Sequence, residues 1–271
     1  MNSEFKKITQ SQFKKIAQAG DTINLSGSDL TDWYLYGVNF QNANLQKSLF
    51  KGVNLKKANL YRTILTGADL RDVNLERANL VRANLTGANL KGANLEGANL
   101  TDANFTDANL EGASLTGASF KDVNFTNANL TKANLTNSYL WGINFSGANL
   151  KGADFLEAML EKANFSRANL TRANFVKADL RCAILKEVIA VEACFATANL
   201  YQANLTNANL TKADFYNANL TEIKLKGANC DKTDFYKALL FNANLREAQN
   251  LDKAINPTKE IQELIQQNKY N

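Results

Sequence analysis

The chain has 271 residues, of which 45% are hydrophobic and 21% charged, a composition typical of a globular protein. Its formal net charge is +5, but residues 1–20 contribute +3 and residues 251–271 are balanced, so residues 21–250 hold only 5 − 3 = +2. This charge is too small for a protein that neutralises many nucleic-acid phosphates, and it is equally unlike a strongly acidic DNA mimic.

Two residue types that usually carry chemistry are scarce. The chain contains no histidine, the commonest general acid–base and metal ligand. Its three cysteines, Cys182, Cys194 and Cys230, lack C-x-x-C spacing, so they predict neither a disulfide framework nor a zinc site. We therefore expect no metal and no cofactor.

Residues 1–20 predict an N-terminal helical cap. Ser11–Ala19 places Phe13, Ile16 and Ala17 on one helical face, and Gly20 follows as a stop signal. No apolar run in this segment is long enough for a secretory signal, and no segment of the chain reaches the length of a membrane span. We expect a cytoplasmic protein without a membrane partner.

A five-residue period governs residues 21–250. From Leu25 to Leu245 every fifth residue is a centre, giving 45 centres, of which 31 are Leu, 12 are Phe, one is Ala190 and one is Cys230. A small or β-branched residue, usually Ala, lies two before each centre, and Asn or Asp lies one before it at 33 of the 45. The phase never breaks, so the period must reflect the fold.

Neither a helix nor a flat strand has this period. On an α-helix five residues advance about 500°, so successive centres would lie about 140° apart, and on a flat strand they would alternate between faces. A chain that turns a corner every five residues keeps every centre inside. Ordering five residues costs about 5–10 kcal/mol and burying one Leu returns about 2–3 kcal/mol, so each short side must stack on neighbours.

The positions of phenylalanine predict four sides per coil, because a large ring is best accommodated between rings stacked above and below it. Folding the sequence at 20 residues collects the phenylalanines into two columns, ten residues apart. The first column holds Phe105, Phe125, Phe145 and Phe165, and the second holds Phe155, Phe175, Phe195, Phe215 and Phe235. Folding at 15 residues scatters them among leucines.

The repeated unit A-N/D-L-x-x, as in "LVRANLTGANLKGANLEGANL" (residues 80–100), resembles the pentapeptide-repeat family, which is especially abundant in cyanobacteria. The resemblance covers residues 21–250 and implies an all-β fold, the right-handed quadrilateral parallel β-helix. With four pentapeptides per coil, 45 centres predict about eleven coils. Most members of the family have no assigned biochemical function.

One coil departs from the repeat. Around Ile184, Ile189 and Cys194 the usual asparagine is missing, and Ala190 is an undersized centre whose minus-two residue, Val188, is larger than usual. We interpret this as an exchange of volume within one side. The coil is also a candidate for a local bend or a functional patch.

Residues 251–271 predict a C-terminal helical cap. Asn256 is the expected N-cap before Pro257, and Ile261, Leu264 and Ile265 follow with helical spacing. Covering the apolar end of the last coil explains this helix, and binding a partner is the alternative.

No enzyme is predicted. A catalytic cleft on a β-helix needs inserted loops, and residues 25–245 contain none. The paired carboxylates Glu187 and Glu192 have no surrounding wall and are interpreted as a solvated surface. The minus-one Asn and Asp residues are too periodic to be catalytic, and we expect them to bond the backbone at corners and to form ladders between coils.

Outward positions predict a partner surface. At 20-residue spacing one column of outward residues is apolar or aromatic, namely Leu156, Val176, Ala196, Tyr216 and Tyr236, here called the outward stripe. A second cluster contains Tyr139, Trp141 and Met159. Such a strip is typical of a protein contact or a homodimer face, although cover by the terminal segments would also explain it.

Basic residues concentrate in residues 51–91. Lys57 and Arg77 share one column and Arg62 and Arg82 the next. These four residues could receive an anionic partner, but Glu76 and Glu96 lie close by and favour a mixed, solubilising surface.

The leading prediction is a non-enzymatic scaffold or regulator that presents a rigid lateral surface to an unidentified protein partner. The first alternative is the activity of one branch of the family, in which an acidic, DNA-like rod protects type II topoisomerases; the near-neutral repeat region disfavours it. The second is weak nucleic-acid binding through the basic residues of 51–91, which we expect to be negligible.

Overall fold

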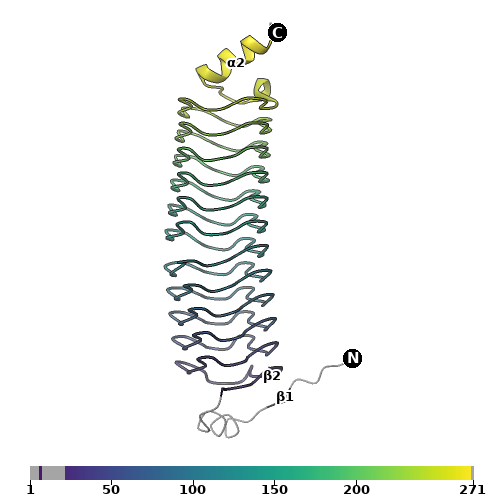
Figure 1. Cartoon of the computed structure of the whole chain (residues 1–271), viewed down its shortest axis with the longest axis vertical. Helices are drawn as coiled ribbons and strands as arrows, with labels where there is room; N and C mark the ends of the chain where they lie inside the picture. Colours follow the sequence, from purple (N-terminus) through teal and green to yellow (C-terminus); the bar gives the residue numbers. More distant parts are fainter. Residues whose placement is uncertain (1–5, 8–21, 270–271) are drawn as a thin grey trace, which may run out of the picture. The chain divides into compact units, whose positions relative to one another are not determined.

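The computed structural model describes residues 6–7 and 22–269 and contains two compact units, Met1–Asn134 and Leu135–Asn271. Each unit is a stack of coils in which the chain turns a corner after every pentapeptide (Figure 1). The predicted helix over Ser11–Ala19 lies outside the described residues. Within the predicted cap of residues 1–20, the described part is strand β1 (Lys6–Lys7), which pairs in parallel with β2 (Ser28–Asp29) of unit 1.

Successive coils pair with an offset of 20 residues. In unit 1 the parallel pairings run from Asn24 with Asn44 to Ser114 with Asn134, and unit 2 has the same offset, as in Asn164 with Ile184. Each side pairs through its minus-one residue, whose carbonyl accepts a hydrogen bond from the centre of the coil before. The offset confirms the predicted four pentapeptides per coil, and the fold is the predicted quadrilateral β-helix.

The described corners are tight turns that share one backbone conformation, with the exception of the corner at Asp32, which lacks the positive φ of the others. In a representative turn the N–H of Ala83 donates to the carbonyl of Leu80 at 2.9 Å, and Arg82 between them has a φ of 59°. A positive φ at the third residue is the pattern of a type II turn, which favours glycine. Only 13 of these corner residues are glycine; the remainder hold side chains in the left-handed region.

The minus-one asparagines stabilise the corners, as predicted. The Oδ1 of Asn84 accepts a hydrogen bond from the N–H of Thr86 at 3.1 Å, and this Asx interaction recurs around the coils. Some asparagines also bond each other between coils: Asn79 Nδ2 donates to Asn59 Oδ1 at 3.2 Å, and Asn129 Nδ2 donates to Asn109 Oδ1 at 2.9 Å.

The core of each unit consists of the centres and the minus-two residues. In unit 1 the rings of Phe105 and Phe125 stack with centroids 5.0 Å apart. In unit 2 the ring of Phe175 stacks between Phe155 at 4.8 Å and Phe195 at 5.0 Å, and it meets Phe165 of the other column edge-on at 5.8 Å. The stacking confirms both phenylalanine columns within the units that contain them.

The repeat of unit 2 ends through a one-residue change of register. Asp234 pairs with Ile255, an offset of 21 residues, because the 3-10 helix η1 (Leu251–Lys253) adds a residue to the last partial coil. Helix α2 (Lys259–Lys269) follows, contacts η1 and buries Ile261, in agreement with a C-terminal cap. The structure corrects the predicted N-cap: the Thr258 carbonyl accepts the first helical bond, from Gln262 N–H at 3.0 Å, whereas Asn256 has a φ of 49° and binds Asp234.

Among the described residues, none of the helices has both the length and the apolar character that crossing a bilayer requires.

Candidate partner-binding surfaces

The outward stripe of unit 2 is a true column. Its residues lie on successive coils, connected by backbone hydrogen bonds such as Glu157 N–H to Val176 carbonyl at 3.0 Å and Asn217 N–H to Tyr236 carbonyl at 2.8 Å. Leu156, Val176 and Ala196 are half-buried turn residues, whereas Tyr216 and Tyr236 are 40% and 46% exposed. The two tyrosines therefore supply most of the accessible apolar surface.

A strained turn lies in the middle of the stripe. Thr197, which follows Ala196, has a φ of 58° and is the only β-branched residue among the described residues with positive φ. A β-branched side chain is strongly disfavoured in this conformation, and such strain is often found at functional sites. Its hydroxyl donates to the Ala196 carbonyl at 2.6 Å, which partly compensates the strain.

The apolar surface extends beyond the stripe at the end of unit 2. Leu239, Phe241 and Ile255 are 61%, 68% and 47% exposed. Tyr236, Leu239 and Phe241 follow one another along one side and its two corners, and Ile255 pairs beside Asp234 on the adjoining side. We call Tyr216, Tyr236, Leu239, Phe241 and Ile255 the C-terminal apolar patch.

Sequence reasoning missed three residues of this patch. Leu239 occupies a minus-one position that normally holds Asn, which was an available signal, and Phe241 is an aromatic residue at an outward corner. Ile255 could not be found in this way, because the change of register places it outside the 20-residue columns.

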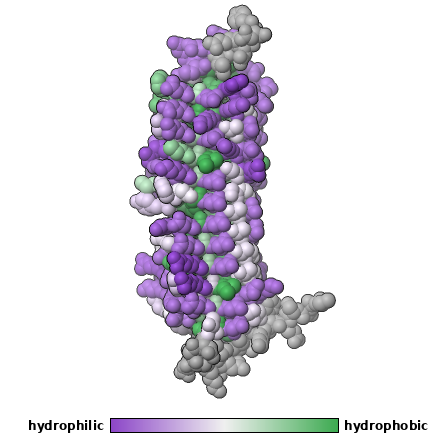
Figure 2. All heavy atoms as spheres, in the orientation of Figure 1, coloured by the Kyte–Doolittle hydropathy of each residue, from purple (hydrophilic) through white to green (hydrophobic). Residues whose placement is uncertain are grey.

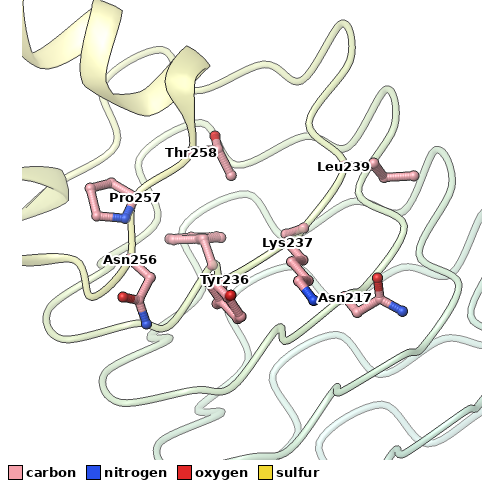
Figure 3. Close-up of a pocket in the computed structure, with 9 residues that line it drawn as sticks. Asn217, Tyr236, Lys237, Leu239, Asn256, Pro257 and Thr258 are labelled. Carbon is pink, nitrogen blue, oxygen red and sulfur yellow. The ribbon is translucent and has the colours of Figure 1, made fainter.

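A pocket of about 680 Å³ adjoins the patch and shares Tyr236 and Leu239 with it. It is bordered by Tyr236, Lys237 and Leu239 on the coil side and by Asn256, Pro257 and Thr258 before α2 (Figure 3). Lys237 Nζ lies 5.3 Å from the Tyr236 ring centroid, and Asn256 Nδ2 donates to Asp234 Oδ1 at 3.1 Å. The pocket thus offers an apolar floor, one cation and amide groups to an incoming chain.

The second predicted cluster also forms. Tyr139 pairs with Met159 on the adjacent coil, and Trp141 lies at the following corner with Lys162 Nζ at 5.4 Å from its ring. Tyr139 and Trp141 are 72% and 65% exposed, so the cluster is accessible. The face of the molecule seen in Figure 2 is mostly hydrophilic, with hydrophobic residues in scattered places.

The four predicted basic residues lie on the two edges of one side of unit 1. Lys57 and Arg77 occupy one corner column and Arg62 and Arg82 the next, with Asn59 and Asn79 between them. Their environment is mixed, as expected: Lys56 bonds Glu76 at 2.6 Å, and Arg82 bonds Asp102 at 3.1 Å. Asp102 and Tyr61 raise the pKa of the Arg82 guanidinium through hydrogen bonds and charge.

Two cysteines and the paired glutamates that the sequence singled out are engaged in structural contacts. Burial raises the pKa of the Cys230 thiol to about 12, and burial with the nearby Asp214 carboxylate raises that of Cys194. Glu187 and Glu192 form ion pairs with Arg167 at 3.0 Å and Arg172 at 2.7 Å, and the latter lowers the pKa of Glu192. Within the described ranges, no cluster of Cys, Asp and Glu is suited to hold a metal ion.

Two family models match the chain. The model described as pentapeptide repeats matches residues 34–72, 63–102, 103–142 and 128–167, and the model described as a pentapeptide repeat region matches residues 158–235. No functionally curated protein matches the sequence.

Solved structures include several similar proteins. HetL, a pentapeptide repeat protein involved in heterocyst differentiation regulation from the cyanobacterium Nostoc sp. strain PCC 7120, is 28% identical, covers 92% of this chain and 98% of its own, and has a TM-score of 0.59. A pentapeptide repeat protein from the Arabidopsis thaliana thylakoid lumen is 33% identical over 43% of this chain and 70% of its own, with a TM-score of 0.25. QnrB1, a plasmid-mediated fluoroquinolone resistance protein, is 21% identical over 73% of this chain and 89% of its own, with a TM-score of 0.45.

Proposed function

The chain belongs to the pentapeptide-repeat family, and on that premise we propose that it is a non-enzymatic scaffold or regulator that binds a partner protein laterally. The observation that carries the proposal is the C-terminal apolar patch, which continues the outward stripe and shares Tyr216 and Tyr236 with it. Large apolar side chains at 40–68% exposure, next to a pocket, are typical of a protein contact.

The patch has the properties of an interaction centre. Aromatic anchors beside a concave site commonly dominate binding energy. Tyr216 and Tyr236 support each other with ring centroids 5.8 Å apart, and their backbones are fixed in the coils, so little entropy is lost when they are covered. A second copy of the chain would be one partner that such a surface could accept.

A regulatory role is the finer part of the proposal. It is supported by the similarity to HetL over nearly the full length of both chains. It is also consistent with the absence of inserted loops in the repeat and with the structural engagement of the glutamates and cysteines.

The proposal is tested by affinity capture from the native cell. We expect a discrete partner with the wild-type chain and its loss with the Phe241→Ser and Tyr236→Ser variants. Tyr34→Ser is the matched control, since Tyr34 is 76% exposed in unit 1 and lies outside the patch. Identical capture by all variants would place the contact elsewhere and refute the patch, and a catalytic activity abolished by changing Glu187 or Glu192 would refute the non-enzymatic assignment.

A further inference from the structure

A basic face lies in unit 1, and it shares no residue with the C-terminal apolar patch. It consists of two stacked sides, centred on Leu60 and Leu80, which occupy the same place on successive coils. Lys57 and Arg77 form one edge, Arg62 and Arg82 form the other, and the amide side chains of Asn59 and Asn79 form the floor. Asn59 is itself held by Asn39 Oδ1 at 3.0 Å and by Gln41 Oε1 at 3.3 Å, so the floor is ordered.

Two of the four cations, Lys57 and Arg62, form no short ion pair among the described residues, although the charge of Lys57 acts on Glu76 from farther away. Within the part of the chain that the structure describes, neither Lys57 nor Arg62 has a carboxylate at ion-pair distance, and Arg77 Nε is 3.8 Å from Glu76. Lys57 and Arg62 lie beside aromatic rings instead. Lys57 Nζ is 6.0 Å from the Tyr36 ring centroid, and the Arg62 guanidinium is 5.1 Å from the Tyr61 ring centroid. The two charges are therefore positioned beside aromatic rings without being held in a short ion pair.

The backbone conformation does not require a cation at any of these four positions. All four lie at the left-handed corner position, with φ between 54° and 59°, where glycine is the most favourable residue. Glycine fills the same column immediately before Lys57 and after Arg77, at Gly37 and Gly97. Most other corners of the repeat also carry a side chain at positive φ, so the conformation itself does not set these four residues apart. What distinguishes them is that four cations flank one short row of asparagines.

The charge of this face indicates which kind of partner it would bind. Residues 41–95 hold nine basic and three acidic residues, a net of 9 − 3 = +6, whereas residues 96–131 hold one basic and five acidic residues, a net of 1 − 5 = −4. The excess of positive charge, counted over all four sides, therefore belongs to these coils, and the four edge cations are fewer than the roughly 6–10 phosphate contacts typical of strong polyanion binders. An amide floor between arginine forks suits carboxylates, which guanidinium groups bind bidentately.

We infer that this face binds an extended, acidic segment of a partner protein, whose carboxylates pair with both cationic edges. The segment lies along the column, crossing the coils, and its backbone meets the asparagine side chains. This contact does not depend on the C-terminal apolar patch, so either surface can be lost without the other.

The test uses the full chain and a fluorescent peptide of alternating Glu and Ser residues, with binding measured by anisotropy at low and at physiological salt. The Lys57→Gly, Arg62→Gly double variant should bind about tenfold more weakly, because two exposed charge contacts are removed. Lys132→Gly is the matched control: Lys132 has a φ of 58° at the same kind of corner in another column of unit 1, and its loss should leave binding unchanged.

The unfolding midpoint of each variant shows whether a loss of peptide binding is caused by a loss of fold stability. The glycine variants should be as stable as the wild type or more stable, since the left-handed conformation suits glycine. The inference is wrong if the double variant and the control bind the peptide equally. It is also wrong if a thymidine oligonucleotide of equal charge binds more tightly than the peptide, which would make the face a nucleic-acid site.

Discussion

The coil of residues 81–100 in unit 1 and the coil of residues 181–200 in unit 2 have the same backbone but different surfaces. Leu90 and Ala190 occupy equivalent centres, and their N–H groups donate to Asn109 and Asn209 at 2.6 and 2.8 Å. Both centres are fully buried. Outside, the first coil presents Asn89 where the second presents Ile189, which is 47% exposed.

The comparison teaches that inward and outward positions are specified separately. Pairing is continuous through the irregular coil, as in Asn169 with Ile189 and Ile189 with Asn209, even though its minus-one asparagines are missing. Centres and minus-two residues therefore determine the coil, and the minus-one and corner residues can change without interrupting it. Binding surfaces are accordingly encoded in the outward positions.

The largest expected effect is on the core of the regular coil. Leu90→Ala should lower the free energy of unfolding by about 3 kcal/mol, because a buried leucine leaves a cavity. Adding Ala88→Val should restore about 1 kcal/mol by reproducing the Val188–Ala190 arrangement of the irregular coil. Urea unfolding of the single and double variants measures both, and a double variant no more stable than the single one would show that the volume exchange is not the compensation.

A smaller gain is expected at the strained corner of the irregular coil. Thr197→Gly should raise the free energy of unfolding by about 1 kcal/mol, since a β-branched residue is replaced at a φ of 58°. The corresponding corner of the regular coil already holds Gly97. As a control, Thr106→Gly should destabilise the protein. Thr106 is the first of the two central residues of its turn, whereas Thr197 is the second, and the Thr106 hydroxyl donates a hydrogen bond to Asn104 Oδ1 at 2.6 Å. A loss of stability in Thr197→Gly would contradict the strain argument.

Exchanging the outward residues should have a still smaller effect. Asn89→Ile removes the bonds from Lys91 N–H and Asn109 Nδ2, both at 3.2 Å, and should cost about 0.5–1 kcal/mol. Ile189→Asn restores the repeat and should change stability by less than about 0.5 kcal/mol. Denaturant midpoints test the pair, and a loss above about 2 kcal/mol in either would mean that the minus-one residues do specify the coil.

The smallest expected effect concerns pH. Arg172 lowers the pKa of Glu192 below its ordinary value of 4.5, so ionised Glu192 is favoured in the folded state. This contribution is present above about pH 4.5 and is lost as the pH falls through the lowered pKa. The difference in melting temperature between wild type and Arg172→Gln should therefore be small at neutral pH and should shrink as the pH falls below about 4.5. A difference that grew on acidification would contradict this sign.

The sequence predicted the coil because the inward pattern is strict. The phenylalanine columns alone indicated the 20-residue period, which the pairings of both units confirm. The termini were less predictable. One extra residue at η1 moves Ile255 out of its column, and Asn256 binds Asp234 rather than capping α2. These outcomes depend on how the end of one particular coil is covered, which a repeat pattern does not contain.

The surfaces were predicted only in outline. The columns of the stripe and of the basic residues follow from the period, but exposure does not: Ala196 is half-buried, whereas Leu239 is largely exposed. Likewise, the rings of Tyr36 and Tyr61 beside the cations depend on side-chain directions that spacing alone leaves undetermined.

The 20-residue offset also has an evolutionary consequence. Duplicating or deleting any whole number of coils within a unit returns every side chain to the same corner, so such a protein can lengthen or shorten by gene duplication without redesign. A single inserted codon shifts that phase, as the extra residue at η1 does where the repeat of unit 2 ends. Natural variants of this chain should therefore differ in steps of twenty residues, and insertions of other sizes should gather at the boundaries of the repeat.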